Sequence, residues 1–241
     1  MPPFPVYIFD VDGTLLDSAE DICGAILEVL AETPWRPLEG NQEVLAGQPG
    51  TAWAVPTADG RGSPSVAGMA DLKRYVGVHL LDMFRELLPG YTDAQHEELI
   101  RNYRTIYPAR QHRATRVYPG VREALEALGG RKSTATTKAS SAAQAILEQF
   151  GLIQYFDHVQ GTDGFPYKPA PDVIHASLEA LGARPEDCLF VGDSPTDMEA
   201  GRRAGVKICA VRYGYGDPEE LARWQPDYWV EDLRELVACS P

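Results

Sequence analysis

Apolar runs of strand length alternate with amphipathic stretches over much of this chain. Residues 4–9 form a short, β-branched and aromatic run that stops at Asp10, a pattern typical of a buried strand. After Val117 the alternation recurs, and we expect strands at 132–136, 157–161, 188–191, 206–211 and 228–230. Helical patterns lie between or beyond them, at 121–128, 139–150, 172–181, 197–204 and the C-terminus. Strands separated by helices predict a doubly wound α/β fold, in which a parallel sheet lies between two helical layers.

The stretch 17–116 has a different pattern. Apolar residues recur at helical spacing, without strand patterns between them, in three places: 18–33, 70–88 and 93–107. Residues 34–68 keep no period, because 11 of these 35 residues are Gly or Pro, and we expect a long irregular loop there. The sequence therefore predicts an α/β core over 1–16 and 117–241. An inserted, all-helical cap is predicted over 17–116, including the Gly/Pro-rich insert at about 34–68.

Composition and charge narrow the class of protein. The chain has 241 residues, 44% hydrophobic and 24% charged, which is enough for one large domain or for a core with a smaller insert. No apolar run approaches the roughly 20 residues needed to cross a bilayer, so no membrane span is expected. The formal net charge of −13 disfavours a nucleic-acid partner, because phosphate backbones select basic surfaces. Any site for a small anion must therefore be built locally.

The N-terminus and the cysteines bear on the compartment. Residues 1–5 lack the basic region and the apolar stretch of a signal peptide. The four cysteines form no Cys-x-x-Cys pair, which favours buried free thiols over disulfides or a zinc site. We therefore expect a cytoplasmic protein. The sequence leaves open whether it is a monomer or a homodimer.

Polar residues stand where the predicted strands end. Asp10 and Asp12 follow the first strand, whereas Thr136 and Asp193 each follow a later one. In a doubly wound sheet, ligands bind beyond the carboxyl ends of the strands, so these side chains should meet in one crevice. Three aspartates that meet there would repel one another unless a divalent cation neutralises them. Oxygen ligands favour a hard ion, and Mg²⁺ is the first choice.

The same residues belong to motifs with a family resemblance. The run Asp10-Val11-Asp12-Gly13-Thr14 resembles the first motif of the haloacid dehalogenase (HAD) superfamily. Three further motifs follow in the order of that family: Thr136-Thr137-Lys138, Lys168-Pro169-Ala170-Pro171-Asp172 and Gly192-Asp193-Ser194-Pro195-Thr196-Asp197. Two segments are similar to phosphoglycolate phosphatases in particular: Val117–Val121 and Tyr213–Leu221. The resemblance covers nearly the whole chain apart from 34–68.

The resemblance implies a two-step phosphoryl transfer. Asp10 would attack phosphorus and form an aspartyl-phosphate, and Asp12 would protonate the leaving oxygen and then activate water. A Mg²⁺ ion would be held by the carboxylates of Asp10 and Asp193 and by the backbone carbonyl of Asp12. Thr136 and Lys168 would hold the phosphoryl oxygens.

Three further residues receive roles from the same resemblance. Asp197 would orient Lys168 or the metal waters. The family usually has Asn after the phosphate-binding hydroxyl, and Thr137 replaces it here, so Thr137 is an alternative to Thr136. Arg74 lies in a segment that resembles the part of the cap that reaches over the substrate. A solvated helix face is the simpler interpretation of Arg74.

The resulting hypothesis is a magnesium-dependent phosphatase that acts on a small phosphorylated metabolite, with 2-phosphoglycolate as the best single substrate. The presence of Asp12 favours phosphate esters, because the resembling dehalogenases lack this second aspartate. Two alternatives stay open: a sugar phosphomutase such as β-phosphoglucomutase, and a catalytically idle binding or regulatory protein. Phosphate release without a need for a bisphosphate would separate the phosphatase from the mutase.

Overall fold

The computed structural model describes residues 2–32, 54–55, 65–66 and 72–237. The chain divides into two compact units. One is formed by Met1–Ser18 together with Thr115–Pro241, and the other by Ala19–Ala114. The insert expected at about 34–68 lies outside the described residues, except for two very short strands.

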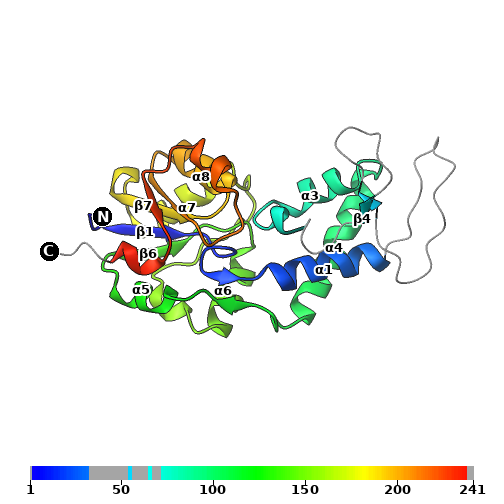
Figure 1. Cartoon of the computed structure of the whole chain (residues 1–241), viewed down its shortest axis with the longest axis horizontal. Coiled ribbons are helices and arrows are strands. Elements are labelled where there is room, and N and C mark those ends of the chain that lie inside the picture. Colours follow the sequence, from blue (N-terminus) through cyan, green and yellow to red (C-terminus); the bar gives the residue numbers. More distant parts are fainter. Residues whose placement is uncertain (1, 33–53, 56–64, 67–71, 238–241) are drawn as a thin grey trace. The chain divides into compact units, whose positions relative to one another are not determined.

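A five-stranded parallel sheet forms the centre of the first unit (Figure 1). Its strands are β1 (Val6–Phe9), β6 (Arg131–Thr134), β7 (Cys188–Gly192), β8 (Lys207–Val211) and β9 (Tyr228–Val230). Their spatial order is β6-β1-β7-β8-β9, and every neighbouring pair is parallel. The predicted doubly wound parallel sheet is therefore confirmed.

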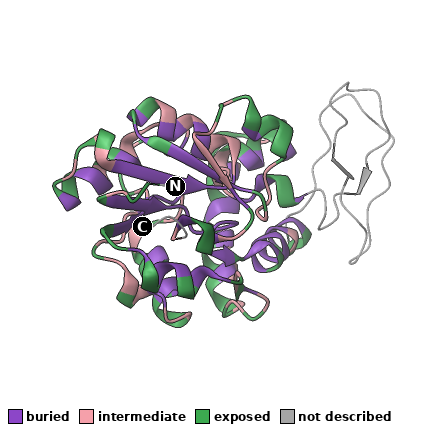
Figure 2. Cartoon of the chain, turned by 60° about the vertical axis from the view of Figure 1, so that its left-hand side comes forward, coloured by how far each residue is buried: buried purple, intermediate pink, exposed green. Residues whose placement is uncertain are grey.

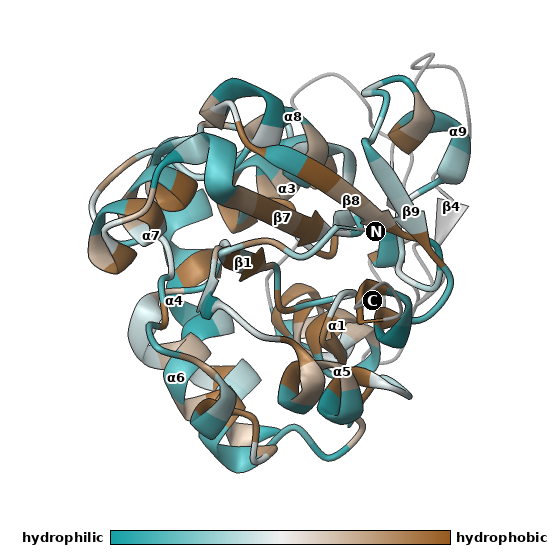
Figure 3. Ribbon diagram, turned by 90° about the vertical axis from the view of Figure 1, so that its left-hand side faces the viewer, coloured by the Kyte–Doolittle hydropathy of each residue, from teal (hydrophilic) through white to brown (hydrophobic). Residues whose placement is uncertain are grey.

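Helices cover both faces of this sheet. Tyr7 and Phe9 pack on one face against α5 (Val121–Ala127) and α6 (Ser140–Gln149). Val6 and Ile8 alternate with them and pack on the other face. The helices on that second face are α7 (Asp172–Leu181), α8 (Pro195–Ala204) and α9 (Pro218–Ala222). The strands are accordingly buried on both sides, as Figure 2 shows, and β7 and β8 are strongly apolar in Figure 3.

The polar strand β6 lies at the edge of the sheet, yet Lys132, Ser133 and Thr134 are all buried. Their polar atoms are satisfied within the fold. Thr134 Oγ1 donates to the carbonyl of Gln160 and accepts from its N–H, each at 2.9 Å. Ser133 Oγ donates to Ser177 Oγ at 3.2 Å. The Lys132 ammonium donates to backbone carbonyls at the turn before the strand.

Residues 157–161 form no strand in the structure, contrary to the prediction. The segment attaches to β6 through isolated bonds instead of a ladder, since Asp157 N–H donates to the Lys132 carbonyl at 2.9 Å and the Thr134 side chain holds Gln160. The C-terminal part of the structure differs from the prediction in two ways. The short helix α9 was not anticipated, and the terminal helix is a 3-10 turn, Leu233–Leu236.

The second unit contains α1 (Ala19–Glu32), α3 (Leu80–Leu87) and α4 (Asp93–Ala109). The expected helix at 70–88 is interrupted. A 3-10 turn, Lys73–Tyr75, precedes Gly77, whose φ of 87° lies in the left-handed region and ends any helical path. Helix α3 then starts afresh, with His79 Nδ1 accepting from the Leu81 N–H at 3.3 Å.

Besides these helices, the second unit contains one very short pair of strands. The strands β3 (Ala54–Val55) and β4 (Ser65–Val66) pair in antiparallel register. In the first unit, β2 (Leu16–Asp17) and β5 (Arg116–Val117) also pair in antiparallel fashion. Of the helices in the described part of the chain, none has both the length and the apolar character of a membrane span.

The hydroxyl of Thr134 gives a test of this account of β6. Thr134→Val keeps the side-chain shape but leaves the Gln160 N–H and carbonyl without their buried partner. We expect the free energy of unfolding, measured by urea titration, to fall by about 1–3 kcal/mol. Thr105→Val is the matched control, because the Thr105 hydroxyl is exposed and donates to the Arg101 carbonyl within its own helix. An equal loss in both variants would contradict the account.

Candidate active site

Strand β1 lies between β6 and β7, so the chain order reverses at this point of the sheet. Ligands in open α/β folds bind at such a switch point, beyond the carboxyl ends of the strands. Asp10 follows β1 directly, and its N–H donates to the Val191 carbonyl of β7 at 2.9 Å. Asp193 follows β7. The topology therefore brings these two aspartates together, as the strand-end argument anticipated.

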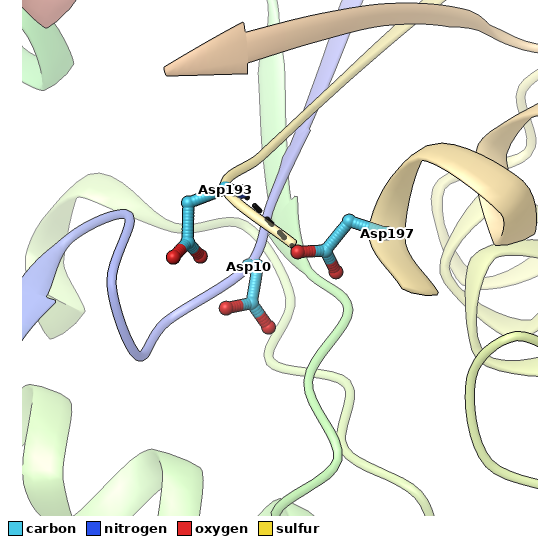
Figure 4. Close-up of side chains that lie close together, drawn as sticks. All are labelled: Asp10, Asp193 and Asp197. Atoms are coloured by element: carbon cyan, nitrogen blue, oxygen red, sulfur yellow. Dashed lines mark hydrogen bonds between the residues drawn. The ribbon is translucent and has the colours of Figure 1, made fainter. Parts of the chain in front are cut away.

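Three buried carboxylates gather here: Asp10, Asp193 and Asp197 (Figure 4). Each offers an oxygen, and the three oxygens lie within 4.8 Å of one another. The side chains are almost fully buried, with 3% or less of each residue exposed. Buried charges of one sign are costly unless a partner neutralises them. The cluster therefore requires cations.

Lys168 supplies one of these cations. Its ammonium donates to Asp10 Oδ1 at 2.6 Å, to Asp197 Oδ1 at 2.5 Å and to the Ala135 carbonyl at 3.0 Å. These three bonds satisfy all three N–H donors of the ammonium group. Lys168 is itself only 2% exposed, so its position is fixed by the two carboxylates and by the end of β6.

Asp197 uses both of its oxygens within the protein. Oδ1 accepts from Lys168, and Oδ2 accepts from the backbone N–H groups of Asp193 and Ser194 at 3.2 and 3.0 Å. The dashed line in Figure 4 marks the bond from Asp193. Ser194 and Asp197 also form the capping box of α8. Asp197 thus joins the helix start to Lys168.

Asp193 is held by neighbours on two loops. Thr14 Oγ1 donates to Oδ1 at 3.2 Å, and the Tyr215 N–H donates to Oδ2 at 2.8 Å. Gly13 lies against the same carboxylate: a Cβ there would stand 2.2 Å from Asp193 Oδ2, and the φ of Gly13 is 86°. Only glycine fits this position, both for space and for backbone conformation.

The Asp12 side chain points to different partners. Ser18 Oγ donates to Asp12 Oδ1 at 2.5 Å, and the Lys138 ammonium lies 3.1 Å from Oδ2. The sequence placed Lys138 within a motif but gave it no role, so this contact was missed. The one feature of the sequence that could have indicated a role for Lys138 is that lysine is scarce, with five in the whole chain.

Thr136 is buried and Thr137 is half-buried at the end of β6. Thr136 Oγ1 accepts from the Lys138 N–H at 3.3 Å. Thr162 stabilises this loop with two hydrogen bonds. Its N–H donates to the Lys138 carbonyl and its hydroxyl donates to the Thr136 carbonyl. These bonds hold the loop in place. Which of the two threonines binds phosphate stays a prediction.

Arg74 lies in the other unit, where its guanidinium donates to Tyr75 OH at 2.7 Å and to Glu86 at 3.4 Å. The side chains of Arg74 and Glu86 are more than half exposed. A part in substrate binding stays a prediction for Arg74.

Burial dominates the electrostatics of the aspartate cluster. It raises the pKa of Asp10 to about 7, against the opposing effect of Lys168 and with a further increase from Asp197 and Asp12. Burial and the charges of Asp197 and Asp10 likewise raise the pKa of Asp193 well above its ordinary value. For Lys168, burial acts to lower the pKa, but Asp10 and Asp197 outweigh it and raise the pKa. Lys168 is thus a permanent cation.

The donor set fits a hard divalent metal ion. The available atoms are carboxylate oxygens, the donors that hard cations prefer. One ammonium faces three carboxylates, so negative charge remains for a cation to balance. Asp10 and Asp193 are the carboxylates suited to this role. Each oxygen of Asp193 accepts one hydrogen bond, from Thr14 or Tyr215, whereas Asp197 Oδ1 is bound to the Lys168 ammonium and Asp197 Oδ2 accepts several bonds at the start of α8.

The chain matches a known protein family over most of its length. The model of the haloacid dehalogenase-like hydrolases matches residues 4–205. The chain therefore belongs to the haloacid dehalogenase-like hydrolase family, as its motifs predicted.

Individual relatives indicate which kind of hydrolase this is. The chain is 33% identical over 234 residues to a phosphoglycolate phosphatase of Pseudomonas syringae pv. syringae, covering 95% of this chain and 77% of that protein. It is 32% identical over 234 residues to a phosphoglycolate phosphatase of Vibrio vulnificus, and the match covers 95% of this chain and 92% of that protein. A solved structure described as a predicted phosphatase from Clostridium acetobutylicum matches with a TM-score of 0.78 and 26% identity, over 98% of this chain and 97% of that one. The chain is an enzyme of the phosphatase class.

The raised pKa of Asp10 can be measured directly. In metal-free protein, the ¹³C signal of the Asp10 carboxyl should titrate with a midpoint of about pH 7, protonated below and ionised above. A divalent cation competes with the proton and should move the midpoint to lower pH. Asp10→Asn assigns the signal by removing it. A midpoint near the ordinary value of 3.8 in metal-free protein would contradict the proposed electrostatics.

Proposed function

We propose that this protein is a magnesium-dependent phosphatase that hydrolyses a small phosphomonoester through an aspartyl-phosphate on Asp10. The observation that carries this proposal is the environment of the Asp10 carboxylate. One oxygen is fixed by Lys168, and the other accepts no hydrogen bond from the residues described. A carboxylate held in this way at the switch point of the sheet is oriented for nucleophilic attack.

In the first step, Asp10 Oδ2 attacks phosphorus while the ester oxygen leaves. Asp12, two residues further on, protonates that leaving oxygen. In the second step, Asp12 takes a proton from water, which attacks the aspartyl-phosphate and releases phosphate. Ser18 and Lys138 support this role because they bond to the two oxygens of Asp12 and hold the carboxylate in place.

We propose Mg²⁺ as the metal, held by the carboxylates of Asp10 and Asp193 and by the backbone carbonyl of Asp12. When bound, it supplies positive charge that reduces the repulsion between an anionic nucleophile and an anionic phosphate. Asp197 would not bind the metal but would orient Lys168, since its oxygens already bond to Lys168 and to the start of α8.

Lys168 and the Thr136 hydroxyl would hold the phosphoryl oxygens, with Thr137 as the alternative hydroxyl. Lys168 would exchange one of its three present hydrogen bonds for a phosphoryl oxygen. This assignment is supported by the bond from Lys168 to the Ala135 carbonyl, which places the ammonium beside the residue preceding Thr136. Positioning and charge stabilisation are the main sources of catalysis in phosphoryl transfer.

The first candidate substrate is 2-phosphoglycolate, because the curated relatives reported above are named phosphoglycolate phosphatases. Arg74 is the candidate residue for substrate recognition in the second unit. We also propose a cytoplasmic location, which is supported by the buried free thiols of Cys23, Cys188 and Cys209.

Phosphate release provides the direct test. The parent protein with Mg²⁺ should release phosphate from 2-phosphoglycolate in preference to other small phosphate esters, and chelation of the metal should stop release. Asp10→Asn should abolish turnover, since an amide is not a nucleophile of comparable strength. Its fold is checked by circular dichroism. A parent that acts on none of the esters, or that requires a sugar bisphosphate, would refute the proposal.

Asp12→Asn separates the acid/base from the nucleophile. The amide cannot donate or accept the catalytic proton, so kcat should fall by about 10²–10⁴-fold while Asp10 remains able to attack. An ester with an acidic leaving group such as 4-nitrophenol needs less help from an acid. Formation of the intermediate from that ester should therefore be less affected than its hydrolysis. Equal loss in both steps would argue against the role of Asp12 as an acid.

A further inference from the structure

The segment Tyr213–Gly216 follows β8 and has no part in the reaction proposed above, yet it contacts the active-site loops at three points. Tyr213 OH donates to the Thr14 carbonyl at 2.7 Å. The Tyr215 N–H donates to Asp193 Oδ2 at 2.8 Å. The Tyr215 hydroxyl reaches the end of the loop that follows β1. One short segment thus touches the loops after both central strands.

The two glycines of this segment allow a very close approach to Asp193. A Cβ on Gly214 would lie 2.2 Å from Asp193 Cβ, and a Cβ on Gly216 would lie 2.0 Å from the Asp193 carbonyl oxygen. Neither glycine has a positive φ, so the backbone conformation would accept other residues. Glycine is required at both positions only because a side chain would have no space. Any side chain here must displace Asp193 or the segment itself.

The Tyr215 hydroxyl, which also bonds to the side chain of Tyr118, has two partners on the segment that ends at Ser18. It accepts from the Ser18 N–H at 2.8 Å and donates to Asp17 Oδ1 at 2.7 Å. Ser18 is the last residue of this unit before the chain enters the second one. Because Ser18 Oγ in turn donates to Asp12 Oδ1 at 2.5 Å, a continuous series of bonds connects Asp193 to Asp12 through Tyr215.

We propose that Tyr213–Gly216 is a positioning segment for the reaction. Gly214 and Gly216 set the place of Asp193, and the Tyr215 hydroxyl fixes Ser18 and, through it, the carboxylate of Asp12. The proposal rests on the roles given above to Asp193 and Asp12. It assigns the two effects to different atoms of the segment, and two variants can therefore separate them.

Gly214→Ala tests the effect on Asp193. Because the added methyl group displaces the carboxylate, Mg²⁺ affinity measured by titration calorimetry should fall by roughly 10–100-fold, as for other residues that orient a metal ligand. Gly129→Ala is the matched control, since a Cβ there meets no atom of the described residues within 4 Å, and its Mg²⁺ affinity should equal that of the parent. A folded Gly214→Ala variant with the affinity of the parent would overturn this part of the proposal.

Tyr215→Phe tests the effect on Ser18 and Asp12, and it is mild enough to preserve the fold. It keeps the backbone bond to Asp193 and removes only the hydroxyl. Hydrogen exchange of the Ser18 amide, followed by NMR, should accelerate by roughly fivefold or more because the N–H loses its acceptor. The value of kcat should fall while Mg²⁺ affinity stays near that of the parent.

Tyr228→Phe is the control for the loss of a hydroxyl, and it should change neither Ser18 exchange nor kcat. Unchanged exchange and kcat in Tyr215→Phe would overturn the role of Tyr215. A loss of Mg²⁺ affinity in Tyr215→Phe as large as in Gly214→Ala would overturn the division between the two effects. Calorimetry and exchange do not depend on turnover. A parent that binds Mg²⁺ but hydrolyses no ester would therefore refute the proposed function while both positioning effects could still be measured.

Discussion

The buried ammonium of Lys168 is the interaction on which this site depends. It bonds to Asp10, to Asp197 and to the carbonyl of Ala135, and so ties together the ends of β1 and β6 and the first turn of α8. Without it, Asp10 and Asp197 would be buried with no cation in contact, at a cost of several kcal/mol for each uncompensated ion. With it, the cluster still carries an excess of negative charge when its three carboxyl groups are ionised. That excess is the physical basis for a divalent cation, because it favours a cation at this place and disfavours an apolar ligand.

The fold creates this arrangement with few residues. The parallel sheet delivers Asp10 and Asp193 to the same edge, and the turn after β7 is tight because Gly192 leaves room for Asp197: a Cβ at Gly192 would lie 2.5 Å from Asp197 Cβ. The carboxylate of Asp197 caps α8 with one oxygen and holds Lys168 with the other. The helix start and the cation site are therefore stabilised by the same side chain.

The parts of the structure that were predictable are those governed by local pattern. The apolar runs of β1 and β7 and the rule that ligands gather at strand ends were enough to bring Asp10 and Asp193 together. The polar strand β6 was harder, because its hydroxyls are satisfied by Gln160 and Ser177, which lie 26 and 44 residues away. The interruption at Gly77 was missed because the apolar spacing continues across it. The contacts of Lys138 and Tyr215 could not be read from spacing, since each depends on two loops that meet only in the folded chain.

The different surroundings of the aspartates also explain why Asp10 is the best candidate nucleophile. Asp197 has no oxygen to offer, because both accept bonds from the protein. The oxygens of Asp193 accept from Thr14 and Tyr215, and those of Asp12 face Ser18 and Lys138. Asp10 alone among these four keeps one oxygen without a hydrogen bond from the described residues, while Lys168 fixes the other. A nucleophile needs both properties: a reactive atom that is accessible to phosphorus, and a second contact that determines its direction of approach.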